Sequence, residues 1–378
     1  MLYILFSADY ELFMGKNYLS EKEIMLDPSS KLLNLCSQHN IPMTLFCDYL
    51  CLEWFRDKGD ERFPKLVESQ LQDAIRSGHD VQTHLHPHWP FTEKIKDNFS
   101  YPLKTFLLGA QSSSEKECYD LAFKYLKSSK LFFEELLKPI IPDYECIAYR
   151  AGGYGIQPFT DAIFQALLDT GYCIDSSVVP GMFSRNHVNS IDFRAFDSKS
   201  SNISLKSGAS IFEIPLASAK LSLKDRLSLY PNFSNIFFNR LRKVLKTSSR
   251  SGRKPRGAPI QISRTETPGM LSKSFNRLLQ PLKTNWMQLE LSPSLKLMQK
   301  VTLNYLKEVS EEEDVFFSFS CHPKAMHQEH FLALDHYCSW IKNHFKGKIK
   351  AIHYQDAKKL LNKKSSLASK EMPYVGRT

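Results

Sequence analysis

Residues 78–89 read GHDVQTHLHPHW, and this stretch decides the fold. A helical pattern over residues 63–76 ends at Gly78, because glycine readily adopts the left-handed backbone that stops a helix. Residues 80–83 then form a short predicted strand that runs into three histidines within five positions. Helix, glycine, strand and polar cluster in this order indicate one unit of a βα fold, with chemistry at the end of the strand.

The same rhythm continues in both directions from this stretch. Short β-rich runs alternate with longer helical patterns, which predicts an α/β fold. The expected strands cover residues 2–6, 43–47, 80–83, 146–149, 172–174, 211–214, 315–320 and 349–353. The expected helices cover residues 29–39, 63–76, 114–137, 158–170, 294–309, 329–345 and 356–361. The helix from Ser114 starts with a capping-box pattern that Glu117 completes.

Length and composition fit a globular chain. The sequence has 378 residues, of which 42% are hydrophobic, and contains no apolar run long enough for a transmembrane helix. Its first residues lack a basic leader and a small-residue cleavage site, so we expect no signal peptide. The eight cysteines form no CxxC pair, and we expect most to be reduced and packed as small apolar residues. These features favour a cytoplasmic location.

The positive charge is concentrated in one segment. The formal net charge is +10, and the window from 239 to 265 holds no acidic residue. Its basic residues are Arg240, Arg242, Lys243, Lys246, Arg250, Arg253, Lys254, Arg256 and Arg264. Residues 220–290 also contain five prolines and little strand signal, so we interpret them as a basic, partly helical insertion in a domain spanning 1–362. The Lys/Ser-rich residues 363–378 are predicted to be a disordered tail.

The insertion contains a candidate amphipathic helix. Its apolar residues recur at helical spacing and are Phe233, Ile236, Phe237, Leu241, Val244 and Leu245. Residues 233–256 could contact an anionic membrane surface peripherally, or the helix could pack on the barrel with its basic face in solvent, and both interpretations stay open. Nucleic-acid binding is disfavoured because no known binding motif accompanies the charge. The sequence makes no prediction of the oligomeric state.

Polar residues follow the predicted strands repeatedly. Asp9, His84, Arg150, Asp175 and His322 each lie at or just after the C-terminal end of a predicted strand. In a βα barrel that edge is where catalytic side chains gather. Structural residues have no reason to choose this edge repeatedly, so the placement predicts an active site.

Two of these positions suggest a metal site. His84 and His88 are four residues apart with Pro87 between them, and they could face one ion if the chain turns there. Asp9 and Glu11 are two apart, so their side chains would point the same way in an extended segment. One carboxylate could then bind a cation while the other acts as a base. The alternatives are a histidine-rich surface loop and a pair of solvated acids.

Two further positions suggest catalytic groups. Arg150 precedes the glycine-rich residues 151–155, whose backbone N–H groups could approach an oxyanion or a phosphate, and its guanidinium could orient a carboxylate. His322 could serve as the general acid for a departing amine. The alternatives are a tight turn with a surface salt bridge and a packed histidine.

Taken in order, these segments resemble the five motifs of the polysaccharide deacetylase family, the NodB-homology carbohydrate esterases. The matching segments are SADYE (7–11), GHDVQTHLHPH (78–88), YRAGGYG (149–155), DSS (175–177) and CHP (321–323). The resemblance covers residues 1–215 and 292–362 and leaves out the basic insertion. It implies an irregular (β/α)7, TIM-like barrel, in agreement with the alternation of strands and helices.

The resemblance also implies an activity and a set of residue roles. The activity would be hydrolysis of the N-acetyl amide of a sugar in a polysaccharide or glycan precursor, with a divalent metal, Zn²⁺ before Co²⁺ or Ni²⁺. The resemblance implies that Glu11, His84 and His88 bind the metal. Asp9 would be the general base, Arg150 would orient Asp9, and His322 would protonate the amine. Gly153 and Tyr154 would lie near the oxyanion, Asp175 belongs to the fourth motif, and His86 would contact substrate or a supporting carboxylate. The alternatives are hydrolysis of a non-sugar amide and a catalytically silent carbohydrate-binding scaffold.

Overall fold

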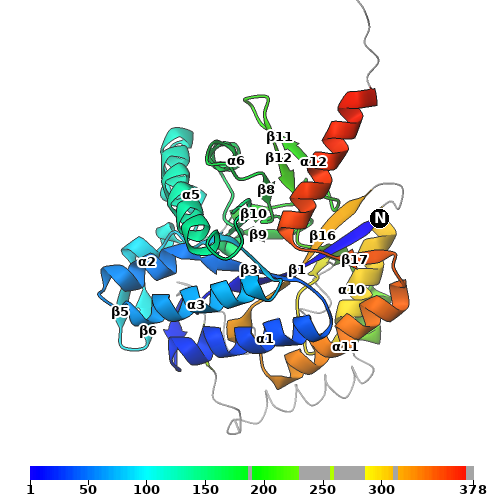
Figure 1. Ribbon diagram of the computed structural model, residues 1–378, viewed down its shortest axis with the longest axis horizontal. Helices are drawn as coiled ribbons and strands as arrows, with labels where there is room; N and C mark the ends of the chain where they lie inside the picture. The colour runs from blue at the N-terminus through cyan, green and yellow to red at the C-terminus, as the bar shows by residue number, and fades with distance from the viewer. Residues whose placement is uncertain (186–189, 230–255, 259–285, 310–313, 372–378) are drawn as a thin grey trace, which may run out of the picture.

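The computed structural model describes residues 1–185, 190–229, 256–258, 286–309 and 314–371. At its centre lies a curled sheet of parallel strands surrounded by helices (Figure 1). The parallel strands are, in chain order, β1 (Leu2–Tyr10), β3 (Met43–Asp48), β4 (Asp80–Leu85), β7 (Ala148–Ala151), β8 (Ile174–Asp175), β12 (Ser210–Glu213) and β16 (Val315–Cys321). In space they run β12-β8-β7-β4-β3-β1-β16.

One parallel bridge closes this sheet into a ring. Leu216, just after β12, pairs with Ser318 of β16. Two backbone hydrogen bonds hold the bridge, from Ser318 N to the Pro215 carbonyl and from Ala217 N to the Ser318 carbonyl. The prediction of an irregular (β/α)7 barrel is therefore confirmed. Two strands extend the sheet outside the ring, β11 (Ser201–Ser204) antiparallel to β12 and β17 (Ile349–Ala351) parallel to β1.

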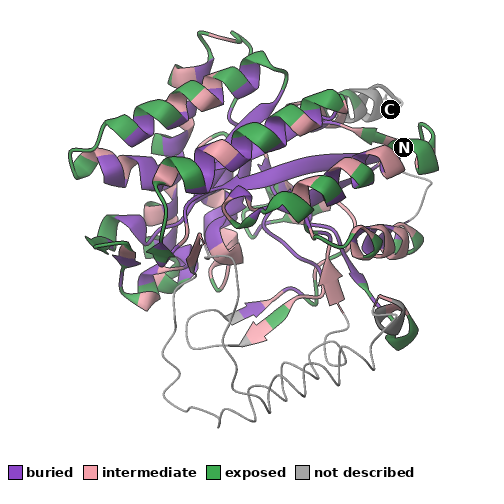
Figure 2. Cartoon of the chain, turned by 90° about the horizontal axis from the view of Figure 1, so that it is seen from below, coloured by how far each residue is buried: buried purple, intermediate pink, exposed green. Residues whose placement is uncertain are grey.

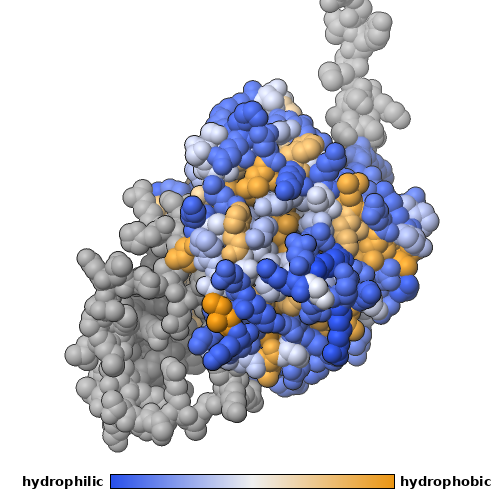
Figure 3. All heavy atoms as spheres, turned by 90° about the vertical axis from the view of Figure 1, so that its left-hand side faces the viewer, coloured by the Kyte–Doolittle hydropathy of each residue, from blue (hydrophilic) through white to orange (hydrophobic). Residues whose placement is uncertain are grey.

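Helices cover the outside of the barrel. They are α1 (Asp27–Gln38), α2 (Tyr49–Asp57), α3 (Arg62–Arg76), α4 (Leu108–Gln111), α5 (Glu115–Leu137), α6 (Thr160–Asp169), α7 (Leu223–Ser228), α10 (Leu295–Glu308), α11 (Gln328–Phe345) and α12 (Tyr354–Glu371). Figure 2 shows buried strands inside and exposed stripes along the outer helix faces. None of the helices in the described ranges is long and apolar enough to cross a membrane. Figure 3 shows a mainly hydrophilic face on which apolar residues form small groups.

Short turns and strands connect the barrel strands and helices or pack beside them. They are the π-helix η1 (Lys22–Leu26), the 3-10 turns η2 (Trp89–Phe91), η3 (Leu103–Thr105), η4 (Gly152–Tyr154) and η5 (Pro323–Ala325), and the strands β2 (Lys16–Asn17), β5 (Glu93–Ile95), β6 (Asn98–Ser100), β9 (Phe183–Arg185), β10 (Ser190–Asp192), β13 (Ser218–Lys220), β14 (Gly257–Ala258) and β15 (Trp286–Gln288). Strands β13 and β15 pair antiparallel beside the barrel, at the two ends of the predicted insertion. The insertion therefore leaves and rejoins the barrel at one place.

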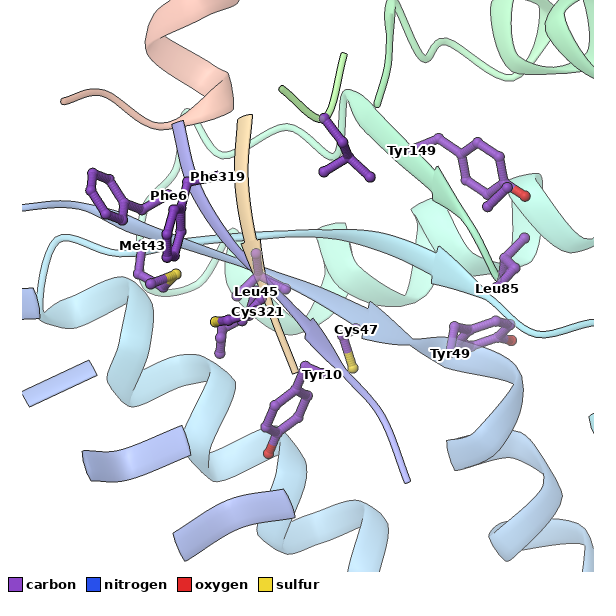
Figure 4. Close-up of a cluster of buried hydrophobic side chains, with 14 of the residues drawn as sticks. Phe6, Tyr10, Met43, Leu45, Cys47, Tyr49, Leu85, Tyr149, Phe319 and Cys321 are labelled. Atoms are coloured by element: carbon purple, nitrogen blue, oxygen red, sulfur yellow. The ribbon is translucent and has the colours of Figure 1, made fainter. Parts of the chain in front are cut away.

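The alternation of side chains along β1 connects the core to the site. Tyr3 and Leu5 point to one buried cluster, which also contains Phe46, Phe316 and Tyr354. The intervening residues of β1 join a larger cluster under the helices, where side chains of β1, β3 and β16 pack together, among them Phe6, Met43, Leu45, Phe319 and Cys321 (Figure 4). Because successive strand residues alternate faces, the side that carries Tyr3 and Leu5 continues as Ser7 and Asp9.

Several boundaries differ from the sequence-based expectation. The first strand runs to Tyr10 instead of residue 6, since it pairs with both neighbours beyond that point, through Ala8 with Cys321 and through Tyr10 with Cys47. The helix expected from residue 29 starts at Asp27. Helix α2 was not predicted.

The ends of two other helices are informative. Ser114 caps α5 as predicted, accepting from Glu117 N, but the Glu117 carboxylate accepts from Ser113 N, so the capping box is only half formed. Helix α12 continues to Glu371, past its expected end at residue 361 and into the segment predicted to be disordered. Residues 372–378 and the candidate amphipathic helix lie outside the described residues, so peripheral membrane contact through 233–256 stays a prediction.

All eight cysteines are free, and seven are buried. Cys36, Cys47 and Cys321 pack in the large cluster between strands and helices. Burial raises the pKa of each of these three thiols well above its usual value, so they stay in the neutral form. They act as small apolar residues, in agreement with the interpretation of the sequence.

Candidate active site

The carboxyl ends of neighbouring strands bring the predicted polar residues to one level of the barrel. Asp48 at the end of β3 pairs in register with His84 of β4, and His84 pairs with Arg150 of β7. Asp9 lies near the end of β1, and His322 follows β16 directly. Parallel strands in register place these side chains side by side, as expected for a site at this edge of a βα barrel.

Three buried side chains converge on one point. Glu11 Oε2 lies 2.6 Å from His86 Nε2 and 3.4 Å from His84 Nε2. Glu11 Oε2 and His84 Nε2 are both inaccessible to solvent, and apart from these close contacts within the group neither has a hydrogen-bond partner. Unpaired buried polar atoms are rare in proteins, because each costs free energy. Two imidazole nitrogens and a carboxylate oxygen form a suitable ligand set for a zinc-like divalent cation, so the residues fit the predicted metal.

The orientation of His84 supports this assignment. Its Nδ1 lies 2.8 Å from the Arg150 carbonyl oxygen, which can only accept, so Nδ1 carries the proton and Nε2 faces Glu11. Burial alone would lower the pKa of His84, but the carboxylates of Glu11 and Asp9 outweigh it and raise that pKa. Cation uptake by these residues would therefore release a proton.

His88, which the sequence spacing paired with His84, is not among the ligand atoms that converge with Glu11. His88 is fully buried, and neither of its ring nitrogens has a hydrogen-bond partner. Its ring packs 3.9 Å from the Tyr101 ring and 5.1 Å from the Trp89 ring, between centroids. Burial and the nearby His86 hold its pKa well below the usual value, so the ring is neutral. The group that converges is Glu11, His84 and His86, and the ligand role of His88 stays a prediction.

The carboxylate of Asp9 lies beside this group and is ionised. Arg150 Nη1 donates to Asp9 Oδ1 over 2.7 Å, and His322 Nε2 lies 3.4 Å from Asp9 Oδ2. Burial alone would raise the pKa of Asp9, but the Arg150 charge and the hydrogen bond with His322 hold it well below its usual range. Asp9 therefore stays a carboxylate, which is the form that a general base needs.

Arg150 is held from every side. Its side chain is fully buried, with Nε donating to the Ser176 carbonyl at 3.0 Å and Nη2 donating to Ser318 Oγ at 3.1 Å and to the Tyr354 hydroxyl at 3.3 Å. The guanidinium also lies over the Phe46 ring at 4.1 Å. A planar fork with this many fixed partners has one orientation, and it presents Nη1 to Asp9.

His322 is paired on its other side with a residue that the sequence did not suggest. Its Nδ1 lies 2.9 Å from Glu290 Oε1, and Glu290 itself is half exposed. Burial alone would lower the pKa of His322, but the hydrogen bonds with Asp9 and Glu290 raise it to about 10. At neutral pH His322 is therefore an imidazolium, which can donate a proton.

Two more residues that the sequence analysis missed hold the converging group. Lys324 Nζ donates to Glu11 Oε1 over 2.8 Å and to the Leu12 carbonyl over 2.9 Å. Asp48 accepts a hydrogen bond from His86 N at 3.1 Å and another from the Trp89 indole N–H. Asp48 ends a strand as the predicted site residues do, so the same rule could have found it. Lys324 carries no comparable signal.

The glycine-rich turn after β7 packs directly on the site. A Cβ on Gly152 would lie 2.5 Å from the Leu85 carbonyl and 2.6 Å from His86 Nδ1, so only glycine allows this approach. Gly153 and Tyr154 both have φ of 61°. The Tyr154 hydroxyl donates to Gln288 Oε1 over 3.1 Å. The oxyanion role of Gly153 and Tyr154 stays a prediction.

Asp175 is not brought to the converging group. It accepts hydrogen bonds from Ser177 N and Ser177 Oγ, and its partner in the next strand is Glu213. The fourth motif reaches the site through Ser176, whose carbonyl and hydroxyl oxygens accept hydrogen bonds from Arg150 at 3.0 and 3.2 Å.

No family model matches the chain, and no curated protein matches it either. Among solved structures, a Mycobacterium smegmatis protein described as a polysaccharide deacetylase has 11% identity and a TM-score of 0.44 over 100% of this chain and 94% of that chain. The PuuE allantoinase has 11% identity and a TM-score of 0.42, over 94% of this chain and 88% of that one. A Pseudomonas aeruginosa PAO1 protein described as a polysaccharide deacetylase has 11% identity and a TM-score of 0.39, over 94% and 89%. Likeness at this level says nothing of what this chain acts on.

Proposed function

We propose that this chain is a metal-dependent hydrolase that cleaves the N-acetyl amide of a sugar. The observation that carries the proposal is the convergence of Glu11 Oε2, His84 Nε2 and His86 Nε2 on one point, beside an ionised Asp9. The five ordered segments that resemble the polysaccharide deacetylase motifs support the sugar amide as the substrate class.

Glu11, His84 and His86 would hold the divalent cation, with Zn²⁺ favoured by the two nitrogen ligands. When bound, such a cation polarises a carbonyl oxygen and lowers the pKa of water. Lys324 binds Oε1 of Glu11, whereas Oε2 faces His84 and His86, where the cation would be held.

The remaining residues supply the two proton transfers that amide hydrolysis needs. Asp9, held by Arg150, would accept a proton from the water that adds to the acetamide carbon, so that the new C–O bond forms. His322 would donate its proton to the amide nitrogen as the C–N bond breaks, and the products are acetate and the free amine. The 3.4 Å between Asp9 Oδ2 and His322 Nε2 allows both groups to reach one substrate amide.

Metal content tests this assignment directly. We expect purified wild-type protein to bind one equivalent of a divalent metal, and His84→Ala and His86→Ala to lose it, because each removes a nitrogen ligand. His88→Ala should keep the metal, since His88 lies outside the converging group. Elemental analysis of each protein, with its melting curve as the control for folding, measures this.

Two outcomes would count against the assignment. If His88→Ala loses the metal while His86→Ala keeps it, the pair with four-residue spacing is the correct one. If the wild type holds no divalent metal and releases no acetate from a panel of N-acetylated sugars, the hydrolase proposal is wrong. Release from non-sugar acetamides alone would keep the chemistry and reject the sugar.

Glu290 provides a second test, because its carboxylate contacts Nδ1 of His322. Glu290→Ala removes the carboxylate that fixes Nδ1, and we expect kcat to fall roughly 10- to 100-fold, as for partners that orient catalytic and metal-bound histidines. Glu290→Gln keeps a hydrogen-bond acceptor and should lose less. Metal content should not change in either variant. Equal rates for wild type and Glu290→Ala would exclude the orienting role.

A further inference from the structure

Two buried carboxyl groups lie side by side and take no part in the proposed reaction. Asp175 of β8 and Glu213 of β12 are partners in register across parallel strands. Asp175 is fully buried and Glu213 is 3% exposed. Among the described residues, no lysine, arginine or histidine forms a salt bridge with either of them.

The hydrogen bonds around the two groups come from neutral donors only. Asp175 accepts from Ser177 N at 3.1 Å and from Ser177 Oγ at 2.7 Å. Glu213 Oε1 accepts from Val178 N at 3.2 Å, whereas Glu213 Oε2 is buried and has no partner. The ionisable groups that face the two carboxyls are Arg150, which is ion-paired with Asp9, and the phenols of Tyr149 and Tyr354.

We propose that Asp175 and Glu213 hold one proton between them at neutral pH and together position the glycine-rich turn of the site. Two adjacent buried carboxylates would repel each other in a medium that screens charge poorly, so one stays protonated. A proton on Glu213 Oε2 also gives that oxygen the hydrogen bond it otherwise lacks, with Asp175 as acceptor. Burial and the charge of Asp175 raise the pKa of Glu213 well above its usual value.

The pair reaches the site through one serine. Ser177 uses its hydroxyl proton for Asp175, and its oxygen accepts from Ala151 N at 2.8 Å. Ala151 is followed by Gly152, which rests against His86. The ionised member of the pair thus fixes the rotamer of Ser177, and Ser177 fixes the start of the turn. The catalytic consequence rests on the proposed function, whereas the shared proton does not.

Infrared spectroscopy of the complete chain tests the shared proton. We expect a wild-type minus Glu213→Gln difference spectrum at neutral pH to show the carbonyl band of a protonated carboxyl, because the glutamine removes that group. The matched control is Glu93→Gln, which alters an exposed strand carboxyl, so the spectrum of this variant should keep the band. Absence of the band from the wild-type minus Glu213→Gln difference spectrum would overturn the proposal.

The pH dependence of stability gives an independent readout. The raised pKa of Glu213 means that the folded chain keeps a proton that the unfolded chain releases, so stability should fall as pH rises above the usual pKa of a glutamate. Glu213→Gln has no proton to release and can donate its amide to Asp175. Its melting temperature should therefore rise relative to wild type as pH rises, and Glu213→Ala should not show this rescue.

Two results would contradict this. Parallel melting-temperature profiles for wild type and Glu213→Gln would show that no proton is retained. Equal losses of melting temperature in Glu213→Gln and Glu213→Ala would show that position 213 needs a charged carboxylate. Neither readout depends on acetate release or metal content, so failure here is distinct from failure of the hydrolase proposal.

Discussion

Asp9→Asn is expected to lower kcat by roughly 10²- to 10⁴-fold, the usual contribution of a positioned general base. The amide matches the carboxylate in size but cannot accept a proton, and Arg150 loses only a charged acceptor. The metal should remain bound, because Glu11, His84 and His86 are unchanged. Steady-state kinetics together with elemental analysis of the same preparation measure both effects.

A different outcome would change the ligand assignment. Asp9, Glu11 and His322 also lie close enough together to hold a cation. If Asp9→Asn loses the metal, Asp9 is a ligand and the base must be sought elsewhere. Asp60→Asn, at an exposed turn, is the matched control and should change neither rate nor metal content.

Arg150→Met is expected to lower the free energy of unfolding by about 3–5 kcal/mol, the range for removing one partner of a buried ion pair. Asp9 would be left buried without its counter-charge, and Ser176, Ser318 and Tyr354 would lose a shared donor. Urea unfolding of metal-free protein measures the loss. Arg150→Lys should recover little, because one ammonium cannot reach acceptors on four sides.

The double variant Arg150→Met, Asp9→Asn separates charge from packing. If the cost arises from the uncompensated carboxylate, adding Asp9→Asn should restore part of the lost stability. A cost that is simply the sum of the two single variants would assign the loss to packing instead.

Much of the fold followed from local patterns. Alternating strands and helices predicted the barrel, because each predicted strand is a short apolar run and each helix has one apolar face. The extent of β1 was less predictable. Ser7 to Tyr10 are strand residues only because β16 and β3 offer backbone partners there, and a run containing serine and aspartate gives no such signal on its own.

The residue at which β4 ends decides which histidine is expected to face the same way as His84. Asp9 and Glu11 were placed on one face by the two-residue repeat of an extended chain, and both lie within 4 Å of His322 Nε2. The same repeat applies to His84 and His86, because β4 continues to Leu85 and not only to Thr83. Pro87 suggested a turn that would pair His84 with His88 instead.

Glu290 and Lys324 could not be found from sequence patterns. Glu290 reaches His322 only because the chain returns from the insertion alongside β16, a pairing between distant segments. Lys324 follows β16, the neighbour of β1, and contacts Glu11, 313 positions earlier in the chain. Such contacts form only when distant segments pack together in the folded barrel, so the spacing of residues along the sequence does not predict them.

The antiparallel ladder of β13 and β15 has a consequence for engineering the chain. Ser218 pairs with Gln288 and Lys220 with Trp286, so the two chain ends of the intervening segment are already held at hairpin distance. A tight turn joining Lys220 to Trp286 would span that gap without disturbing the register that seals the barrel at Leu216 and Ser318. The segment between Lys220 and Trp286 could therefore be replaced by another sequence, while the bridge between Leu216 and Ser318 that closes the barrel near His322 is kept.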